Sequence, residues 1–270
     1  MKTHIHSLAL AYTDHGIGLP VIFLHAFPLN RHMWDGEIQA LLADQRYRLI
    51  ALDWRGFGES ELSSSSTKPV ISTMDMFASD VAGLMDVLGI EQAVLCGLSM
   101  GGYAAFAFAR SYPQRLRALI LADTRPGADT PEAVGNREVV AQLAETQGSG
   151  AIADLQLPRL VSDYTRRHHP EVETRIRQLI DAATPHGIAA ASRGMAVRLD
   201  ASDLLPTIAC PTLVVVGADD VLTPAPGARD YAAQIPGAQL AIIPHAGHLS
   251  NLEQPLNFIQ TIRAFLQTLS

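Results

Sequence analysis

The stretch Ala93-Val94-Leu95-Cys96-Gly97-Leu98-Ser99-Met100-Gly101-Gly102-Tyr103-Ala104-Ala105-Phe106 decides the fold of this chain. Four apolar residues lead into a serine flanked by glycines, and an alanine-rich helical pattern follows. This order predicts a buried strand, a tight turn and a helix. Gly97 and Gly101 stand two positions from Ser99, where small residues let the strand and the helix approach closely. Because the N–H groups of a helix N-terminus favour negative charge, Ser99 is a candidate nucleophile.

Apolar runs of the same kind recur along the chain and alternate with helical patterns. Continuous apolar runs are typical of strands in a parallel sheet that helices cover on both faces. The runs are residues 21–24, 47–53, 93–96, 116–121, 212–216 and 240–243, and the helical patterns are residues 33–42, 74–88, 100–111, 225–234 and 252–269. This alternation predicts the α/β class with a mostly parallel central sheet and helices on both faces.

Residues 125–203 interrupt the alternation. They contain helical patterns at 137–146 and 171–183, several prolines and no comparable strand run. A structureless loop of this length is not expected in a compact domain. We therefore expect a helical cap at 125–203, inserted into a core made of residues 1–124 and 204–270.

A serine hydroxyl becomes a good nucleophile only when a positioned base takes its proton. In a strand–turn–helix setting of this kind, an acid and then a histidine follow the serine along the chain. His248, in the loop before the last helical pattern, is the favoured base, and His245, which closes the last strand run, is the alternative. For the acid, Asp219 and Asp220 follow one strand run and Asp123 follows another. The acid would hold the imidazole in the correct tautomer.

Further stretches resemble motifs of the α/β-hydrolase superfamily, and the resemblance covers the whole chain except the predicted cap. His25-Ala26-Phe27-Pro28 is similar to the His-Gly-x-Pro loop, Asp53-Trp54-Arg55-Gly56-Phe57-Gly58-Glu59-Ser60 to D-x-R-G-x-G-x-S, Gly217-Ala218-Asp219-Asp220 to G-x-x-D, and Ala246-Gly247-His248 to the C-terminal G-H. The serine turn looks closest to the branch of 3-oxoadipate enol-lactonases and cofactor-free haloperoxidase-like esterases. The predicted cap resembles the variable cap of this superfamily.

This resemblance implies roles for particular residues. Asp220 rather than Asp219 would be the acid, and the backbone N–H groups of Phe27 and Met100 would form the oxyanion hole. Ala26 departs from the usual glycine, and a residue other than glycine adopts an unusual backbone angle at a higher free-energy cost. No metal or organic cofactor is expected.

The chemistry expected of this chain is hydrolysis of a small carboxylic ester or lactone through an acyl-enzyme on Ser99. The same triad could instead serve perhydrolysis, thioester hydrolysis or C–C bond hydrolysis, and the fold could also serve a non-catalytic ligand-binding protein. We expect the cap to select the substrate. Candidates there are Leu155, Leu157 and Leu160 for an apolar wall and Arg198 for a substrate carboxylate. Helix packing and a salt bridge are the alternative roles of these residues.

Composition limits the partners. Hydrophobic residues make up 48% of the chain, charged residues 17%, and the net charge is −7. This balance argues against a nucleic-acid partner, and no apolar stretch reaches the roughly 18 residues that span a membrane. No apolar segment follows residues 1–6, so no secretory signal is expected. Cys96 and Cys210 are predicted to be core residues, and the serine run 63–66 an exposed loop. We expect a cytoplasmic protein that acts on a small molecule, and its oligomeric state is left open.

Overall fold

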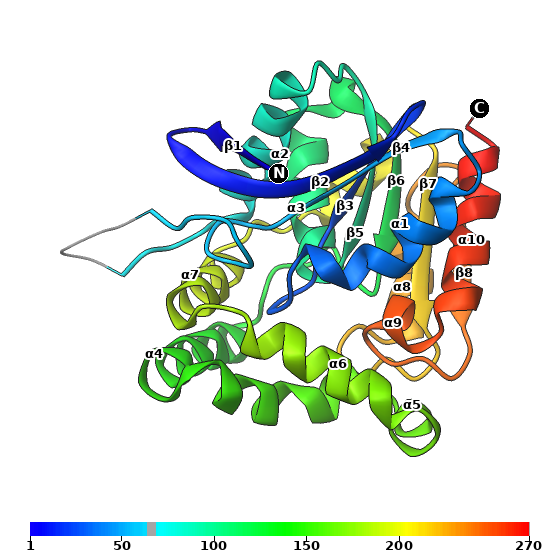
Figure 1. The fold of residues 1–270 in the computed structure, drawn as a ribbon. Coiled ribbons are helices and arrows are strands. Elements are labelled where there is room, and N and C mark those ends of the chain that lie inside the picture. The colour runs from blue at the N-terminus through cyan, green and yellow to red at the C-terminus, as the bar shows by residue number, and fades with distance from the viewer. Residues whose placement is uncertain (64–68, 270) are drawn as a thin grey trace.

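An eight-stranded sheet forms the centre of the part of the chain that the computed structural model describes, residues 1–63 and 69–269 (Figure 1). The strand order is β1-β2-β4-β3-β5-β6-β7-β8. From β4 to β8 in this order neighbouring strands are parallel, whereas β1 pairs antiparallel with β2, and β2 with β4. The strands are β1 (Lys2–Ile5), β2 (Leu8–Gly16), β3 (Leu19–Leu24), β4 (Tyr47–Leu52), β5 (Ala93–Leu98), β6 (Leu116–Ala122), β7 (Thr212–Gly217) and β8 (Gln239–Ile243). The predicted α/β class with a mostly parallel sheet is confirmed.

Every predicted apolar run forms a strand of this sheet. The central strands are buried on both faces, whereas β8 lies at the edge and is half-buried. Residues 21–24 of β3, for example, have no exposed surface. Sequence patterns do not identify β1 and β2. They lie at the edge of the sheet, and the second half of β2 carries polar residues such as Asp14 and His15 that reach water. A continuous apolar run is therefore not required there.

Helices cover both faces of the sheet (Figure 1). Helices α1 and α10 contact each other on one face, and α2 and α3 contact each other on the other. The predicted helix 252–269 is in fact two helices that meet at Gln254 (φ −132°, ψ 61°), because Pro255 keeps the preceding residue out of the helical region. The core elements are η1 (Arg31–Trp34), α1 (Asp35–Leu42), α2 (Met74–Val87), α3 (Met100–Ser111), η2 (Pro113–Arg115), η3 (Ser202–Thr207), α8 (Ala225–Ala232), α9 (Ser250–Glu253) and α10 (Pro255–Gln267).

Four helices follow β6 before the chain returns to the sheet at β7: α4 (Pro131–Leu160), α5 (Asp163–His168), α6 (Pro170–Asp181) and α7 (Pro185–Ala196). All residues of this segment are described, and none of them forms a strand. Helix α4 bends at Gly148 (φ 83°, ψ −178°) and contacts both α6 and α7. The helices form a layer below the sheet in Figure 1. We keep residues 125–203 as the proposed extent of this cap, a range whose last residue falls within η3.

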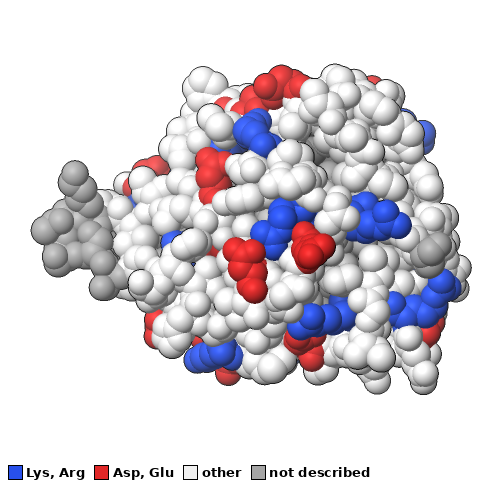
Figure 2. Space-filling view, turned by 90° about the horizontal axis from the view of Figure 1, so that it is seen from above, with Lys and Arg blue, Asp and Glu red and all other residues white. Residues whose placement is uncertain are grey.

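The side of the molecule away from the cap is seen in Figure 2. Acidic and basic side chains are mixed over this face, and neither sign gathers into a patch. Within the described ranges no helix has the length and apolar character needed to cross a membrane. Both cysteines are free; Cys96 is buried in β5 and Cys210 is half-buried. The predicted serine loop 63–66 lies, from residue 64 onward, outside the described residues.

Candidate active site

Ser99 lies in the turn between β5 and α3, with a strained backbone in the positive-φ region (φ 54°, ψ −112°). A Cβ atom added at Gly97 would overlap the backbone of Gly101, and one added at Gly101 would overlap the carbonyl group of Leu24. Glycine at both positions therefore allows β3, β5 and α3 to meet at this turn. The predicted strand, turn and helix are all present.

The structure brings Ser99, His248 and Asp220 together in one line of contacts. Oγ of Ser99 lies 2.8 Å from Nε2 of His248, and Nδ1 of His248 lies 2.9 Å from Oδ2 of Asp220. All three are buried, with exposed fractions of 9%, 3% and 4%. With the proton on Nδ1, the imidazole donates to Asp220 and leaves Nε2 to accept the hydroxyl proton. This is the geometry that a serine nucleophile with its base and orienting acid requires.

The surroundings of His248 and Asp220 shift their pKa values in opposite directions. Burial alone lowers the pKa of His248, but the charge of Asp220 and the hydrogen bond to it outweigh burial and raise this pKa above its usual value. Burial alone raises the pKa of Asp220, but the charge of His248 and hydrogen bonds from His248 and Thr223 lower it to about 2. The Asp220 carboxylate therefore stays ionised at neutral pH and can stabilise an imidazolium on His248.

The alternative residues lie elsewhere. His245 is exposed and stacks on Tyr164, with ring centroids 4.4 Å apart. Asp219 is exposed as well. Asp123 is fully buried, but it accepts hydrogen bonds from the amide of Gly217 (2.8 Å) and from Oγ of Ser250 (2.5 Å) rather than contacting the imidazole. Burial first, and then the nearby charge of Asp220, raise the pKa of Asp123 to about 8.

The backbone N–H groups of Phe27 and Met100, expected to form the oxyanion hole, donate no hydrogen bond to any residue that the structure describes. They are free to bind an oxygen atom. Met100 is the first residue of α3, and Phe27 lines the same cavity as Ser99. The expected backbone strain at Ala26 is absent, because its φ is not positive. Its amide donates to Sδ of Met33 instead (3.2 Å).

His25 positions the loop that carries Phe27, a role that the sequence motif located but did not explain. Its Nδ1 lies 2.9 Å from the carbonyl oxygen of Ala26, and its Nε2 accepts the amide of Trp54 at 3.0 Å. The indole of Trp54 donates in turn to the carbonyl of His25 (3.0 Å). Burial lowers the pKa of His25 to about 4. The ring therefore stays neutral above that pH and keeps Nε2 free to accept.

Ser99 and His248 open into a cavity of about 290 Å³, near the lower end of the ~300–1,000 Å³ of small-molecule sites. Of the predicted cap leucines, Leu160 lines this cavity, Leu157 packs in the core, and Leu155 is exposed. The cavity is also lined by residues that sequence patterns did not single out, among them Arg125, Asp129, Asn136, Arg137, Gln156 and Arg159.

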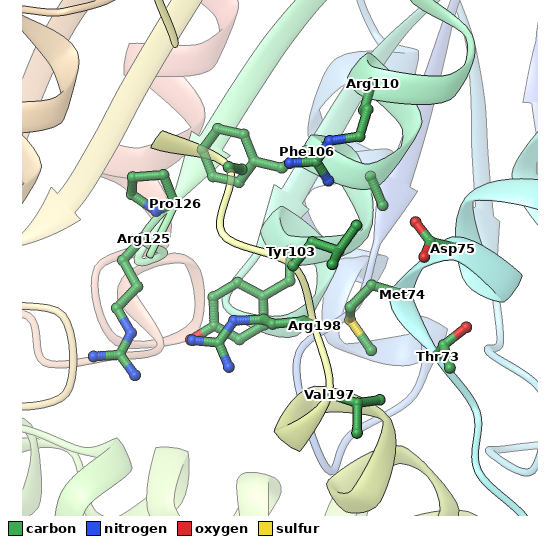
Figure 3. A pocket seen from close by; sticks show the side chains of 13 residues that line it. Thr73, Met74, Asp75, Tyr103, Phe106, Arg110, Arg125, Pro126, Val197 and Arg198 are labelled. Carbon is green, nitrogen blue, oxygen red and sulfur yellow. The ribbon is translucent and has the colours of Figure 1, made fainter. Parts of the chain in front are cut away.

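Arg198 does not line the catalytic cavity. It borders a neighbouring cavity of about 120 Å³ that shares Tyr103 and Arg125 with the first one. Figure 3 shows its guanidinium lying against the ring of Tyr103, and 4.2 Å separates its Cζ from the ring centroid. The guanidinium also pairs with Asp129 at 2.8 Å and donates to the carbonyl of Gly127 at 2.7 Å. The salt-bridge role of Arg198 is thus the one that the structure supports, and its expected role toward a substrate carboxylate is not.

Comparison with known proteins agrees with this fold. A family model described as the alpha/beta hydrolase fold matches residues 20–255. A thermophilic esterase from Thermogutta terrifontis, solved with malate bound, is 47% identical, with a TM-score of 0.93 and coverage of 99% of this chain and 97% of that one.

Two curated relatives cover nearly as much of the chain. The 3-oxoadipate enol-lactonase 2 of Acinetobacter baylyi is 30% identical over 92% of this chain and 88% of its own length. A Mycobacterium tuberculosis protein named as a non-heme bromoperoxidase, BpoC, is 31% identical over 94% and 99%. The chain belongs to the α/β-hydrolase fold family, and its relatives support hydrolase activity.

Proposed function

We propose that this protein is a serine hydrolase that cleaves a small carboxylic ester or lactone. The observation that carries the proposal is the 2.8 Å contact between Oγ of Ser99 and Nε2 of His248, backed by Asp220 at 2.9 Å. A hydroxyl held in this way is a nucleophile for acyl transfer. The esterase and the enol-lactonase among the relatives support the same class of bond.

The reaction takes place in two halves. Oγ of Ser99 attacks the ester carbonyl carbon while its proton passes to Nε2 of His248, and Asp220 stabilises the imidazolium. The amides of Phe27 and Met100 bind the oxyanion of the tetrahedral intermediate. His248 then protonates the leaving alcohol. In the second half, water gives a proton to His248 and attacks the acyl-enzyme, and the carboxylic acid leaves as Ser99 recovers its proton.

The size of the cavity supports a small substrate. A volume of about 290 Å³ lies near the lower end of the ~300–1,000 Å³ of small-molecule sites. The Thermogutta terrifontis esterase holds malate, and we expect the cavity of this chain to admit molecules of similar size.

Hydrolysis of 4-nitrophenyl butyrate by matched variants tests the proposal. We expect His248→Asn and Ser99→Ala each to lower kcat by at least about 10³-fold, because each removes a member of the triad. His245→Asn is the matched control and should retain wild-type activity, since His245 is exposed and asparagine tolerates its positive φ of 60°. A fluorophosphonate probe should label Ser99. Full activity of Ser99→Ala would refute the proposal.

Perhydrolysis is the second candidate, because the relative from Mycobacterium tuberculosis is named as a bromoperoxidase. In that reaction hydrogen peroxide replaces water as the acceptor of the acyl group, and the peracid product oxidises bromide. Peroxide-dependent bromination in the presence of a carboxylic acid, abolished by Ser99→Ala, would favour this candidate. Ester hydrolysis with no bromination would favour the first.

A further inference from the structure

The wall of the catalytic cavity is basic although the whole chain is acidic. Arg125, Arg137 and Arg159 line the same cavity as Ser99 and His248. The chain as a whole has a net charge of −7. Basic residues gathered in one cavity of an acidic protein raise the local concentration of an anionic ligand.

Asp129 is the acidic residue that lines this cavity, and three arginines surround its negative charge. Its side chain has no exposed surface, and it pairs with Arg125 at 2.8 Å, with Arg137 at 2.9 Å and with Arg198 at 2.8 Å. Burial alone raises the pKa of Asp129, but the charges and hydrogen bonds of Arg137 and Arg198 outweigh burial and lower it. One ionised carboxylate therefore faces three guanidiniums, which leaves an excess of positive charge beside the cavity.

Three arginines that line this cavity retain unused donors. The side chain of Arg159 makes no hydrogen bond or ion pair with any residue that the structure describes. The Nε atom of Arg125 is buried and has no partner among the described residues, while its Nη2 binds Asp129. Arg137 binds Asp129 through Nε alone, and its two Nη groups have no partner among the described residues. Arg198, by contrast, does not line this cavity. Its Nε has no partner among the described residues either, but its Nη groups bind Asp129 and backbone carbonyl groups. The donors available to a ligand in this cavity thus belong to Arg125, Arg137 and Arg159.

We propose that Arg125, Arg137 and Arg159 form a carboxylate-binding subsite, so that the substrate is an ester or lactone that carries a free carboxylate. This inference rests on the proposed hydrolase function and deepens it. The planar guanidinium presents paired N–H groups that match the two oxygens of a carboxylate. Asn136 and Gln156 line the same cavity and offer amide donors. The subsite lies on the loop after β6 and on α4, whereas Ser99 lies between β5 and α3.

A pair of esters of the same shape tests the subsite. Monoethyl glutarate ends in a carboxylate, and ethyl 5-methylhexanoate replaces it with a neutral isopropyl group. We expect the wild type to have the higher kcat/KM for monoethyl glutarate, measured by proton release. Arg159→Gln should lower the ratio of the two kcat/KM values by about tenfold. A charge-assisted hydrogen bond to a partly exposed group contributes a factor of about this size.

The design separates the subsite from the fold and from the reaction. Arg159 has no hydrogen-bond or ion-pair partner among the described residues to lose, and a ratio measured within one preparation cancels any loss of folded protein. Arg167→Gln is the matched control, because Arg167 lies on α5 of the same cap, is 73% exposed and does not line the cavity. It should leave the ratio unchanged. High salt should lower the wild-type ratio by screening the charges.

Calorimetric titration of glutarate into Ser99→Ala protein tests the subsite without turnover. We expect binding, and about tenfold weaker binding when Arg159→Gln is added. The subsite is refuted if glutarate does not bind, or if Arg159→Gln changes neither the affinity nor the ratio. Failure of the wild type to hydrolyse either ester, with glutarate still bound through Arg159, would instead refute the proposed reaction and leave the subsite supported.

Discussion

Replacing Asp220 with asparagine, beside the same change at Asp123, tests which buried carboxyl group orients His248. Only Asp220 reaches the imidazole, with Oδ2 2.9 Å from Nδ1. Its Oδ1 accepts the amides of Leu222 at 2.8 Å and Thr223 at 3.0 Å. These two donors would hold the oxygen of an asparagine amide at the Oδ1 position. Its NH2 group would then face Nδ1 of His248.

An NH2 group in that place selects the wrong tautomer of His248. The imidazole must accept at Nδ1 and therefore carries its proton on Nε2, where it cannot take the proton of Ser99. Loss of the correct tautomer costs about 10⁴-fold in kcat, or ~5.5 kcal/mol of barrier height. The asparagine of Asp123→Asn could still accept from Gly217 and donate to Ser250, so kcat of this variant should stay within about tenfold of the wild type.

The assay is kcat for 4-nitrophenyl butyrate, measured for the wild type and both variants. Circular dichroism and thermal melts show whether each variant is folded under the assay conditions. A loss of about 10³-fold or more in Asp123→Asn, with Asp220→Asn within about tenfold of the wild type, would reverse the two roles. Asp123, and not Asp220, would then be the residue that orients His248.

Three further results are expected. First, kcat/KM should rise with pH as His248 loses its proton, and the midpoint should lie above the usual 6.5 because Asp220 raises this pKa; a midpoint at or below 6.5 would contradict the assigned pair. Second, Gly101→Ala should lower the free energy of unfolding by about 1–3 kcal/mol, whereas Gly135→Ala, with nothing within 4 Å, should raise it by about 0.4–1 kcal/mol; thermal melts of both variants give the comparison. Third, the folded protein keeps a proton on Asp123 between pH 3.8 and about 8 that the unfolded chain lacks, so stability should fall as pH rises through this window; denaturant titrations should find a smaller fall in Asp123→Asn.

Strands of the sheet could be predicted from the sequence where they form continuous apolar runs, as strands buried on both faces do. The strands β3 to β8 appear as continuous apolar runs, and the turn at Ser99 appears through its glycines. Strand β2, which lies between the edge strand β1 and β4, has no continuous apolar run because half of it meets water. Helix α7 has buried residues around most of its circumference, so it shows no clear apolar stripe. Its position depends on packing against α4, which the sequence does not encode locally.

The site shows the same contrast between residues that a local sequence pattern identifies and residues that only packing brings together. Ser99, Asp220 and His248 each follow a strand, and the ends of neighbouring parallel strands meet at one edge of the sheet. Chain order therefore led to Ser99 and favoured His248. It left Asp123, Asp219 and Asp220 open as the acid, and only the family resemblance selected Asp220.

Asp129 and its arginine partners come from the loop after β6, from helix α4 and from the segment after α7, and no periodic pattern links them. For this reason the sequence drew attention to Arg198, which pairs with Asp129 in the structure, and missed Arg159.

Two carboxyl groups, Asp220 and Asp123, lie near His248, and two negative charges there would keep the imidazole protonated. Burial of Asp123 prevents this, because it raises the pKa of that carboxyl group. If both were ionised, their charges would together raise the pKa of His248 and keep it protonated at neutral pH, when it must be neutral to act as a base. The pKa of Asp220 is lowered to about 2, whereas that of Asp123 is raised to about 8. Asp220 therefore supplies one negative charge for the imidazolium, and Asp123 keeps its proton and holds Gly217 and Ser250 as a neutral group. Environments that push two carboxyl pKa values apart in this way assign them different roles from the same chemical group.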